Sequence, residues 1–139
     1  MIPLVITEKA YLAGLIDGEG SITLTVSNKG QFPQPQLSIS NNNLKVLKWV
    51  KRKLKCGSIV KKYPRKPTHS LSYGWQINRA GRVMEVLGNI KDFLIIKKPQ
   101  ALLILNKYKK VTPRNGRYSK EMLEKKMKLV REIRKLNQR

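Results

Sequence analysis

The sequence predicts an α+β fold with the order αββαββα, in which a four-stranded antiparallel saddle sheet carries helices on its convex side. Two observations predict it. Apolar and polar residues alternate in four short segments, which is typical of half-buried strands, and apolar residues recur every three or four positions in the segments around them, which is typical of helices. We expect one domain over residues 1–139, with a core at 1–110 and an extension of extra C-terminal helices at 111–139.

The first helix is expected over about residues 7–18, with Thr7 as its N-cap. Its apolar residues follow helical spacing and point into a core: Leu12, Leu15 and Ile16. Small residues recur every fourth position and form a strip with almost no side chain: Ala10, Gly14 and Gly18. Such a strip lets a second backbone approach closely.

Two carboxylates, Asp17 and Glu19, follow at the C-terminal end of this helix. The helix dipole disfavours negative charge at that end. If two such helices pack along their small strips, their carboxylates come together and repel. A hard divalent cation with oxygen ligands is the usual remedy.

The strands are expected as two hairpins, at about 21–29 with 36–40 and at about 58–63 with 70–77. Their outward side chains are hydroxyls, amides and lysines with almost no acids, which suits base edges and phosphates in the major groove. The candidate DNA-contacting residues on this face are Ser21, Thr23, Thr25, Ser27, Lys29, Gln36, Ser38, Ser40, Ser58, Val60, Lys62, Ser72, Gly74 and Gln76. Phosphate contacts are expected from Arg65, Lys66 and Arg117.

The remaining periodic segments predict four more helices. One follows the Asn41–Asn43 cap cluster, one follows Asn78 as its cap, one begins at Pro99, and the last is capped by Ser119. Basic residues cover the last helix, which fits a solvated face and direct DNA contact equally well. Its apolar stripe is expected to be Leu123, Met127, Val130 and Ile133.

The composition favours a folded protein that binds a polyanion. Hydrophobic residues make up 40% of the chain, and 30 Lys and Arg against 8 Asp and Glu give a net charge of +22. Nucleic acid is the favoured partner, ahead of an acidic membrane surface, because the basic residues are spread over several elements. No apolar run is long enough to span a bilayer, and the N-terminus does not resemble a secretory signal.

The single cysteine, Cys56, excludes an intramolecular disulfide and fits a reducing compartment, so we expect an intracellular protein. Cys56 itself is expected to be a small buried residue. The single histidine, His69, is expected in a loop, and no zinc site is expected.

Residues 12–20, Leu-Ala-Gly-Leu-Ile-Asp-Gly-Glu-Gly, resemble the LAGLIDADG signature at all but two positions, where Gly18 replaces Ala and Glu19 replaces the second Asp. The signature is that of the LAGLIDADG homing endonucleases, DNA-cutting enzymes encoded inside introns or inteins. The resemblance implies the homing-endonuclease fold, with acidic helix ends over the minor groove. It also implies a metal-dependent staggered double-strand break, with 3′ overhangs, in a long pseudo-palindromic target.

The same resemblance implies roles for individual residues. Glu19 would be the metal ligand, assisted by the backbone carbonyl of Gly18, and Mg²⁺ is the implied ion, with Mn²⁺ or Ca²⁺ able to occupy the site. Asp17 would be mainly structural. The run at residues 93–101 resembles the segment that carries a basic residue near the active site, and Lys97 matches it better than Lys98.

Two more positions complete the implied site. Asn43 matches a polar position that orients water, and Lys48 would add to the basic pocket. Because the motif occurs once, we expect a symmetric homodimer on double-stranded DNA, joined through the strip of Ala10, Gly14 and Gly18.

Two rival functions stay open on the same scaffold: an RNA maturase whose partner is intron RNA, and a DNA-binding protein that does not cut. Intact acidic residues favour cutting. A plasmid-cleavage assay with and without Mg²⁺ separates the enzyme from both rivals, and an intron-splicing assay identifies the maturase.

Overall fold

The computed structural model describes residues 2–26, 29–63 and 71–138. The order of its elements confirms the predicted αββαββα arrangement followed by extra helices. The elements are α1 (Ile6–Glu19), β1 (Gly20–Thr25), β2 (Gln34–Asn41), α2 (Leu44–Leu54), β3 (Ser58–Lys62), β4 (Ser72–Ile77), α3 (Ala80–Ile90), the 3₁₀ turn η1 (Lys91–Phe93), α4 (Lys98–Lys107), the 3₁₀ turn η2 (Lys109–Val111) and α5 (Lys120–Asn137).

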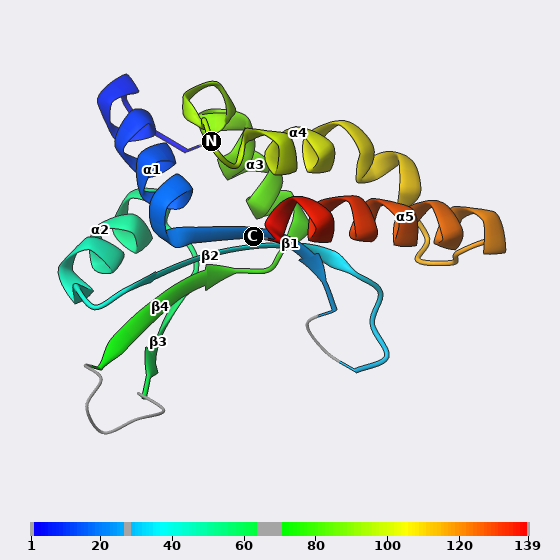
Figure 1. The fold of residues 1–139 in the computed structure, drawn as a ribbon, viewed down its shortest axis with the longest axis horizontal. Coiled ribbons are helices and arrows are strands. Elements are labelled where there is room, and N and C mark those ends of the chain that lie inside the picture. Colours follow the sequence, from blue (N-terminus) through cyan, green and yellow to red (C-terminus); the bar gives the residue numbers. More distant parts are fainter. Residues whose placement is uncertain (1, 27–28, 64–70, 139) are drawn as a thin grey trace.

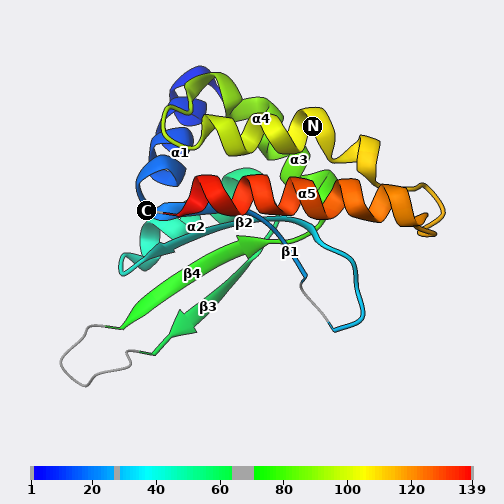
Figure 2. The same ribbon diagram turned by 45° about the vertical axis from the view of Figure 1, so that its right-hand side comes forward.

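The four strands form one antiparallel sheet in the order β1-β2-β4-β3. Figure 1 shows the sheet arching away from the helices, which all lie on one side of it, and the turned view in Figure 2 agrees. The opposite face of the sheet is free of helices. This is the saddle that the alternation of the strands predicts, with its concave side left open.

Strand β2 begins earlier than the sequence indicates, at Gln34, and includes Pro35. A proline lacks the N–H that a central strand donates to its neighbours. Pro35 is accommodated because β4 pairs only with residues 37–41 of β2. The first residues of β2 therefore pair with β1 alone.

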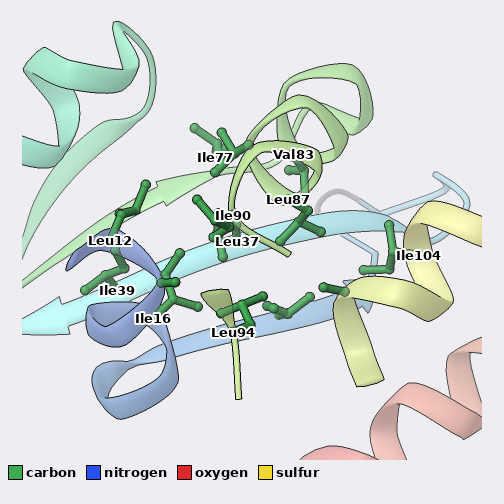
Figure 3. Packing of buried hydrophobic residues seen from close by; sticks show 14 of the residues in the cluster. Leu12, Ile16, Leu37, Ile39, Ile77, Val83, Leu87, Ile90, Leu94 and Ile104 are labelled. Carbon is green, nitrogen blue, oxygen red and sulfur yellow. The ribbon is translucent and has the colours of Figure 1, made fainter. Parts of the chain in front are cut away.

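The core lies between the sheet and the helices that cover it. Figure 3 shows side chains from α1, β2, β4, α3 and α4 meeting there. They are almost fully excluded from solvent and include Leu12, Ile16, Leu37, Ile39, Ile77, Val83, Leu87, Ile90 and Ile104. Burying a side chain of this size contributes about 1.5–3 kcal/mol to folding. This packing fixes the end of α1 against the first two strands.

Trp75, on β4, is one of the largest side chains of the hydrophobic core. Its ring is fully buried, and its Nε1 donates a hydrogen bond to the Cys56 carbonyl at 3.1 Å. Gly57 has a φ of +94°, and a Cβ there would lie 2.2 Å from Trp75 Nε1, so this turn requires glycine. Cys56 is half-buried, and desolvation raises the pKa of its thiol, which disfavours a nucleophilic role.

The helix caps differ in part from those predicted. Thr7 lies inside α1, which begins at Ile6 with Val5 as its N-cap. The Glu8 carboxylate accepts a hydrogen bond from the Val5 backbone N–H at 3.0 Å and so stabilises this earlier start. The N-cap of α3 is Arg79, one residue after Asn78. Ser119 caps α5 as predicted, since its hydroxyl accepts from the Met122 backbone N–H at 3.1 Å.

The buried stripe of α5 is also shifted from the predicted one. Val130 and Ile133 are buried as expected, but Met127 is exposed and Lys126 is buried in its place. Hydrophobicity alone could not reveal this, since the lysine is buried against two tyrosines of the preceding segment. In the described part of the chain, no helix has both the length and the apolar character needed to cross a membrane.

Candidate functional site

Asp17 ties the end of α1 to the segment that precedes α4. Its carboxylate oxygens accept hydrogen bonds from the backbone N–H groups of Ile95, at 2.7 Å, and Lys97, at 2.9 Å. The Lys97 ammonium returns the contact by donating to the Asp17 carbonyl at 2.7 Å. The carboxylate is thereby occupied by structural bonds, and the lysine is held beside the last turn of α1.

Glu19, the last residue of α1, has an exposed side chain. Its Oε2 accepts a hydrogen bond from the side-chain amide of Asn41 at the end of β2. The Asn41 Oδ1 in turn accepts from the Asn43 backbone N–H at 2.8 Å, which orients the amide toward Glu19. The residue that contacts the acidic position is therefore Asn41.

Asn43, the predicted water-orienting residue, has another contact. Its side-chain oxygen accepts from the backbone N–H groups of Lys45, at 3.0 Å, and Val46, at 3.3 Å, and so caps α2. Sequence reasoning missed Asn41 because three asparagines in a row read as one cap cluster. The hairpin register, with Gly20 opposite Ile39, is the signal that locates it.

Lys98 and Lys48, the other two predicted lysines, have no described hydrogen bond to the acidic end of α1. Lys98 is the first residue of α4, and its half-buried side chain has no described contact with the end of α1. Lys48 is exposed on α2, beside Arg52 and Lys55 around a shallow pocket. Of the three lysines, only Lys97 is placed at the acidic end of α1 by a described hydrogen bond.

One protomer supplies few metal ligands. Within the described ranges, no group of three or more His, Cys, Asp or Glu side chains comes together. The donor set at the end of α1 is the exposed Glu19 carboxylate with the carbonyl of Gly18, which lies in the last helical turn, where carbonyls lack the usual N–H partner. Mg²⁺ is commonly bound by one or two carboxylates together with waters and substrate phosphates, and this donor set fits such an ion.

The strand register brings the predicted polar side chains onto the open face of the sheet. Paired positions across it include Ser21 with Ser38, Ser40 with Gly74, and Lys62 with Ser72. The residues that share this face are Ser21, Thr23, Thr25, Gln36, Ser38, Ser40, Ser58, Val60, Lys62, Ser72, Gly74 and Gln76. None of the 8 acidic residues of the chain lies in any of the four described strands.

The other predicted contacts lie off the sheet. Lys29 is exposed in the β1–β2 connection, because β1 ends at Thr25, and Arg117 is exposed just before α5. Ser27, Arg65 and Lys66 lie outside the described residues.

Side chains on the open face also bond to one another. Gln36 donates through Nε2 to the Gln76 Oε1 at 3.3 Å, and Lys62 donates through its ammonium to the Ser40 hydroxyl. A Cβ at Gly74 would lie 2.7 Å from the Lys62 Cε. Glycine at this position therefore leaves room for the lysine side chain to cross β4 and reach β2.

The small strip of α1 faces away from the protomer. Ala10, Gly14 and Gly18 are exposed, and a Cβ added at either glycine would meet no atom within 4 Å. Figures 1 and 2 show α1 at one end of the helical layer. Two large apolar side chains beside its acidic end, Ile95 and Ile96, are 84% and 67% exposed. The small strip, the two isoleucines and Glu19 are thus all exposed in one protomer.

Comparisons with known proteins identify the family and support the fold. The family described as LAGLIDADG endonuclease matches residues 12–122. The homing endonuclease I-CvuI, solved with its DNA target in the presence of Ca, is 21% identical, with a TM-score of 0.76 over 96% of this chain and 83% of that one. A second complex of I-CvuI was solved with Mg.

Two further solved structures are similar. The archaeal intron-encoded homing endonuclease I-Vdi141I, complexed with DNA, is 25% identical, with a TM-score of 0.76 over 96% of this chain and 86% of that one. The LAGLIDADG meganuclease I-AabMI, bound to uncleaved DNA, is 22% identical, with a TM-score of 0.65 over 88% of this chain and 43% of that one. No curated protein matches the chain at a significant level.

Proposed function

The chain belongs to the LAGLIDADG endonuclease family, and on that premise we propose that it is a site-specific homing endonuclease that acts on DNA as a symmetric homodimer. Its target would be a long pseudo-palindromic duplex, and its product a staggered double-strand break with 3′ overhangs. It would be encoded by an intron and act in a prokaryotic cytoplasm or an organelle. The observation that carries the proposal is an uncovered glycine strip that ends at an exposed carboxylate.

The dimer proposal rests on three small residues, Ala10, Gly14 and Gly18, which recur every fourth position on an exposed face of α1. A glycine inside a helix costs about 1 kcal/mol relative to alanine. Gly14 and Gly18 have open space where a side chain would lie, so the protomer itself does not require glycine there. A second α1 packed along this strip would account for both residues and would bring the two Glu19 side chains near one axis.

The acidic end of α1 would be the catalytic site. Glu19 and the Gly18 carbonyl would hold Mg²⁺, with Mn²⁺ or Ca²⁺ as substitutes, and the DNA phosphate would complete the ligand set. When bound, the ion would neutralise charge on the scissile phosphate and lower the pKa of an attacking water. The I-CvuI complexes solved with Ca and Mg support a divalent ion.

The surrounding side chains would orient the Glu19 carboxylate and neutralise charge on the DNA phosphate. The Asn41 amide holds the Glu19 carboxylate in one orientation, and we propose Asn41 for the role that the sequence suggested for Asn43. The Lys97 ammonium, fixed at the Asp17 carbonyl, would stabilise negative charge that develops on the phosphate.

The open face of the sheet would read the target. A two-stranded β-ribbon fits the major groove, and hydroxyl and amide side chains can bond to base edges there. The net charge of +22 would draw the face onto the phosphate backbone and make binding salt-dependent. The same charge would attract RNA, so intron RNA is included as a second partner in the experiment below.

A plasmid library with randomised inserts tests the proposal. The wild-type chain is expected to cut a subset of sequences with Mg²⁺ and none with EDTA. Glu19→Gln should bind the selected sequences equally well but cut them at least about a hundredfold more slowly. Glu124→Gln removes a charge from an exposed site on α5 and is the matched control.

Each outcome has a defined meaning. Failure of the wild type to nick any sequence with Mg²⁺ would overturn the enzymatic proposal, and retained cutting by Glu19→Gln would overturn the metal role of Glu19. Accelerated splicing of a group of intron RNAs without DNA cleavage would instead identify a maturase.

A further inference from the structure

Phe32 and Tyr118 join two parts of the chain that are far apart in sequence. Phe32 lies just before β2, and Tyr118 lies just before α5. Their ring centroids are 4.1 Å apart, with 39° between the ring planes, so the two rings form a close, tilted contact. Figures 1 and 2 show the start of α5 and the segment just before β2 at the same end of the molecule.

Tyr118 is also held in place by Lys126. This lysine is 1% exposed, and its ammonium lies 4.7 Å from the Tyr118 ring centroid and 4.6 Å from that of Tyr108. The ammonium also donates to the Tyr118 hydroxyl. Desolvation lowers the pKa of Lys126 to about 8 and raises the pKa of Tyr118. Lys126 thus fixes the Tyr118 side chain to α5, independently of the contact with Phe32.

The other end of α5 is fixed to β1. Asn137 donates through Nδ2 to the Ile22 carbonyl at 2.9 Å and accepts from the Gln100 side-chain amide at 3.0 Å. Helix α5 therefore contacts the β1–β2 hairpin through both of its ends. Asn137, at its C-terminal end, bonds to Ile22 of β1, and Tyr118, just before its N-terminal end, packs on Phe32.

The part of the hairpin that Tyr118 reaches has no third strand of the described sheet beside it, and its support comes from the buried Leu24 and Pro35 and from the packing of α5 on β1. Strand β4 pairs only with residues 37–41 of β2, so residues 34–36 pair with β1 alone. A two-stranded ribbon depends on packing against other elements for its stability, and the Phe32–Tyr118 contact adds such packing at its outer end. Thr23 opposite Gln36 and Thr25 opposite Gln34 lie on this ribbon.

We propose that Tyr118 is a positioning residue for DNA recognition, which through its contact with Phe32 fixes the paired residues 23–25 and 34–36 of β1 and β2 against the target. The inference rests on the proposed function. At about 3.3 Å per residue, Thr25 lies roughly 17 Å along the strand from Gly20. The bases affected are therefore those distant from the cleaved phosphates, while bases near the centre are read independently of Tyr118.

Selection from a randomised duplex library tests this, with base preference measured at each position. Tyr118→Ala is expected to lose about tenfold or more of its discrimination at the outer positions of each half-site and to keep it at the central ones. Phe32→Ala should give the same pattern, and the double variant should be no worse than either single one, because both changes break one contact. Tyr118→Phe keeps the ring and should select the wild-type site.

Tyr108→Ala is the matched control, because the Tyr108 ring also contacts the Lys126 ammonium but has no described contact with Phe32. It should keep the outer preferences. The inference is overturned if Tyr118→Ala selects the wild-type site, if its preferences weaken uniformly, or if Tyr108→Ala reproduces the outer loss. If Tyr118→Ala does not fold, Phe32→Ala decides by the same criteria. A wild-type chain that selects no sequence would overturn the proposed function, and the inference with it.

Discussion

Asn41 donates its side-chain amide to the Glu19 carboxylate and is itself oriented by the backbone N–H of Asn43. The relation joins the end of β2 to the end of α1 and gives the exposed acid a fixed direction. A carboxylate that must bind a metal gains affinity from such a partner, and loss of the partner typically costs 10–100-fold. The pair is therefore the first place to test the proposed site.

We predict that Asn41→Ala lowers the single-turnover cleavage rate about 10–100-fold and leaves the DNA dissociation constant unchanged, because the amide orients Glu19 without being required to hold the duplex. Raising the Mg²⁺ concentration should restore part of the rate. Asn42→Ala, at an exposed neighbour, is the control. An unchanged rate in Asn41→Ala would exclude the orienting role.

The two adjacent lysines should behave differently. Lys97→Met removes the ammonium that lies 2.7 Å from the Asp17 carbonyl and should reduce the cleavage rate about 10²–10³-fold, the usual effect of losing one preorganised charge donor. Lys98→Met alters a side chain with no described contact at that end of α1, so its rate should stay within about threefold of the wild type. Equal losses in both variants, measured under single-turnover conditions, would contradict the assignment of Lys97.

Much of the fold follows from patterns that a sequence carries locally. Alternation fixed the strand faces, and the register confirms that Ser21, Ser38 and Gln76 share one side of the sheet. The inclusion of Pro35 in β2 depends on where β4 ends, which no local pattern reveals. Spacing of apolar residues likewise put Met127 in the core, whereas the buried position belongs to Lys126.

The residues of the candidate site that belong to the sequence motif were predictable, and those contributed by other segments were less so. Asp17, Gly18 and Glu19 are consecutive, so their grouping needs no tertiary information. Lys97 reaches them from 80 positions along the chain, and only a family resemblance could suggest it. Asn41 required the hairpin register, because the distance of an asparagine from Glu19 depends on the number of residues in the turn.

Gly14→Leu should separate the proposed dimer into monomers. A leucine side chain on this exposed face would hold two α1 backbones apart, while within the protomer it meets open space. The variant should fold at least as stably as the wild type, since glycine is the poorer helix former by about 1 kcal/mol. Light scattering after gel filtration gives the mass, and cleavage should be lost with the dimer.

Gly88→Leu is the matched control for this experiment. Gly88 is also exposed within a helix, α3, and a Cβ there would likewise meet no atom within 4 Å. It should keep the mass and the activity of the wild type. A wild-type chain that stays monomeric both alone and on DNA contradicts the homodimer itself.

Lys126 makes stability depend on pH in a direction unusual for a lysine. Burial lowers its pKa from 10.5 to about 8 in the folded protein, so the unfolded chain binds more protons between these values. Stability should therefore rise with pH across this window, whereas below pH 8 the cost of burying the charge is fully present. Lys126→Met removes the ionisable group and keeps most of the volume.

The free energy of unfolding of Lys126→Met minus that of the wild type should be largest near pH 7 and should shrink as the pH rises above 8, by at most about 1.4 kcal/mol per pH unit. Urea unfolding between pH 7 and 9 measures it, about one pH unit below the pKa of a tyrosine in the unfolded chain. Lys128→Met, at an exposed position on the same helix, should show no such slope. A difference between Lys126→Met and the wild type that stays constant over this range would mean that Lys126 does not titrate there.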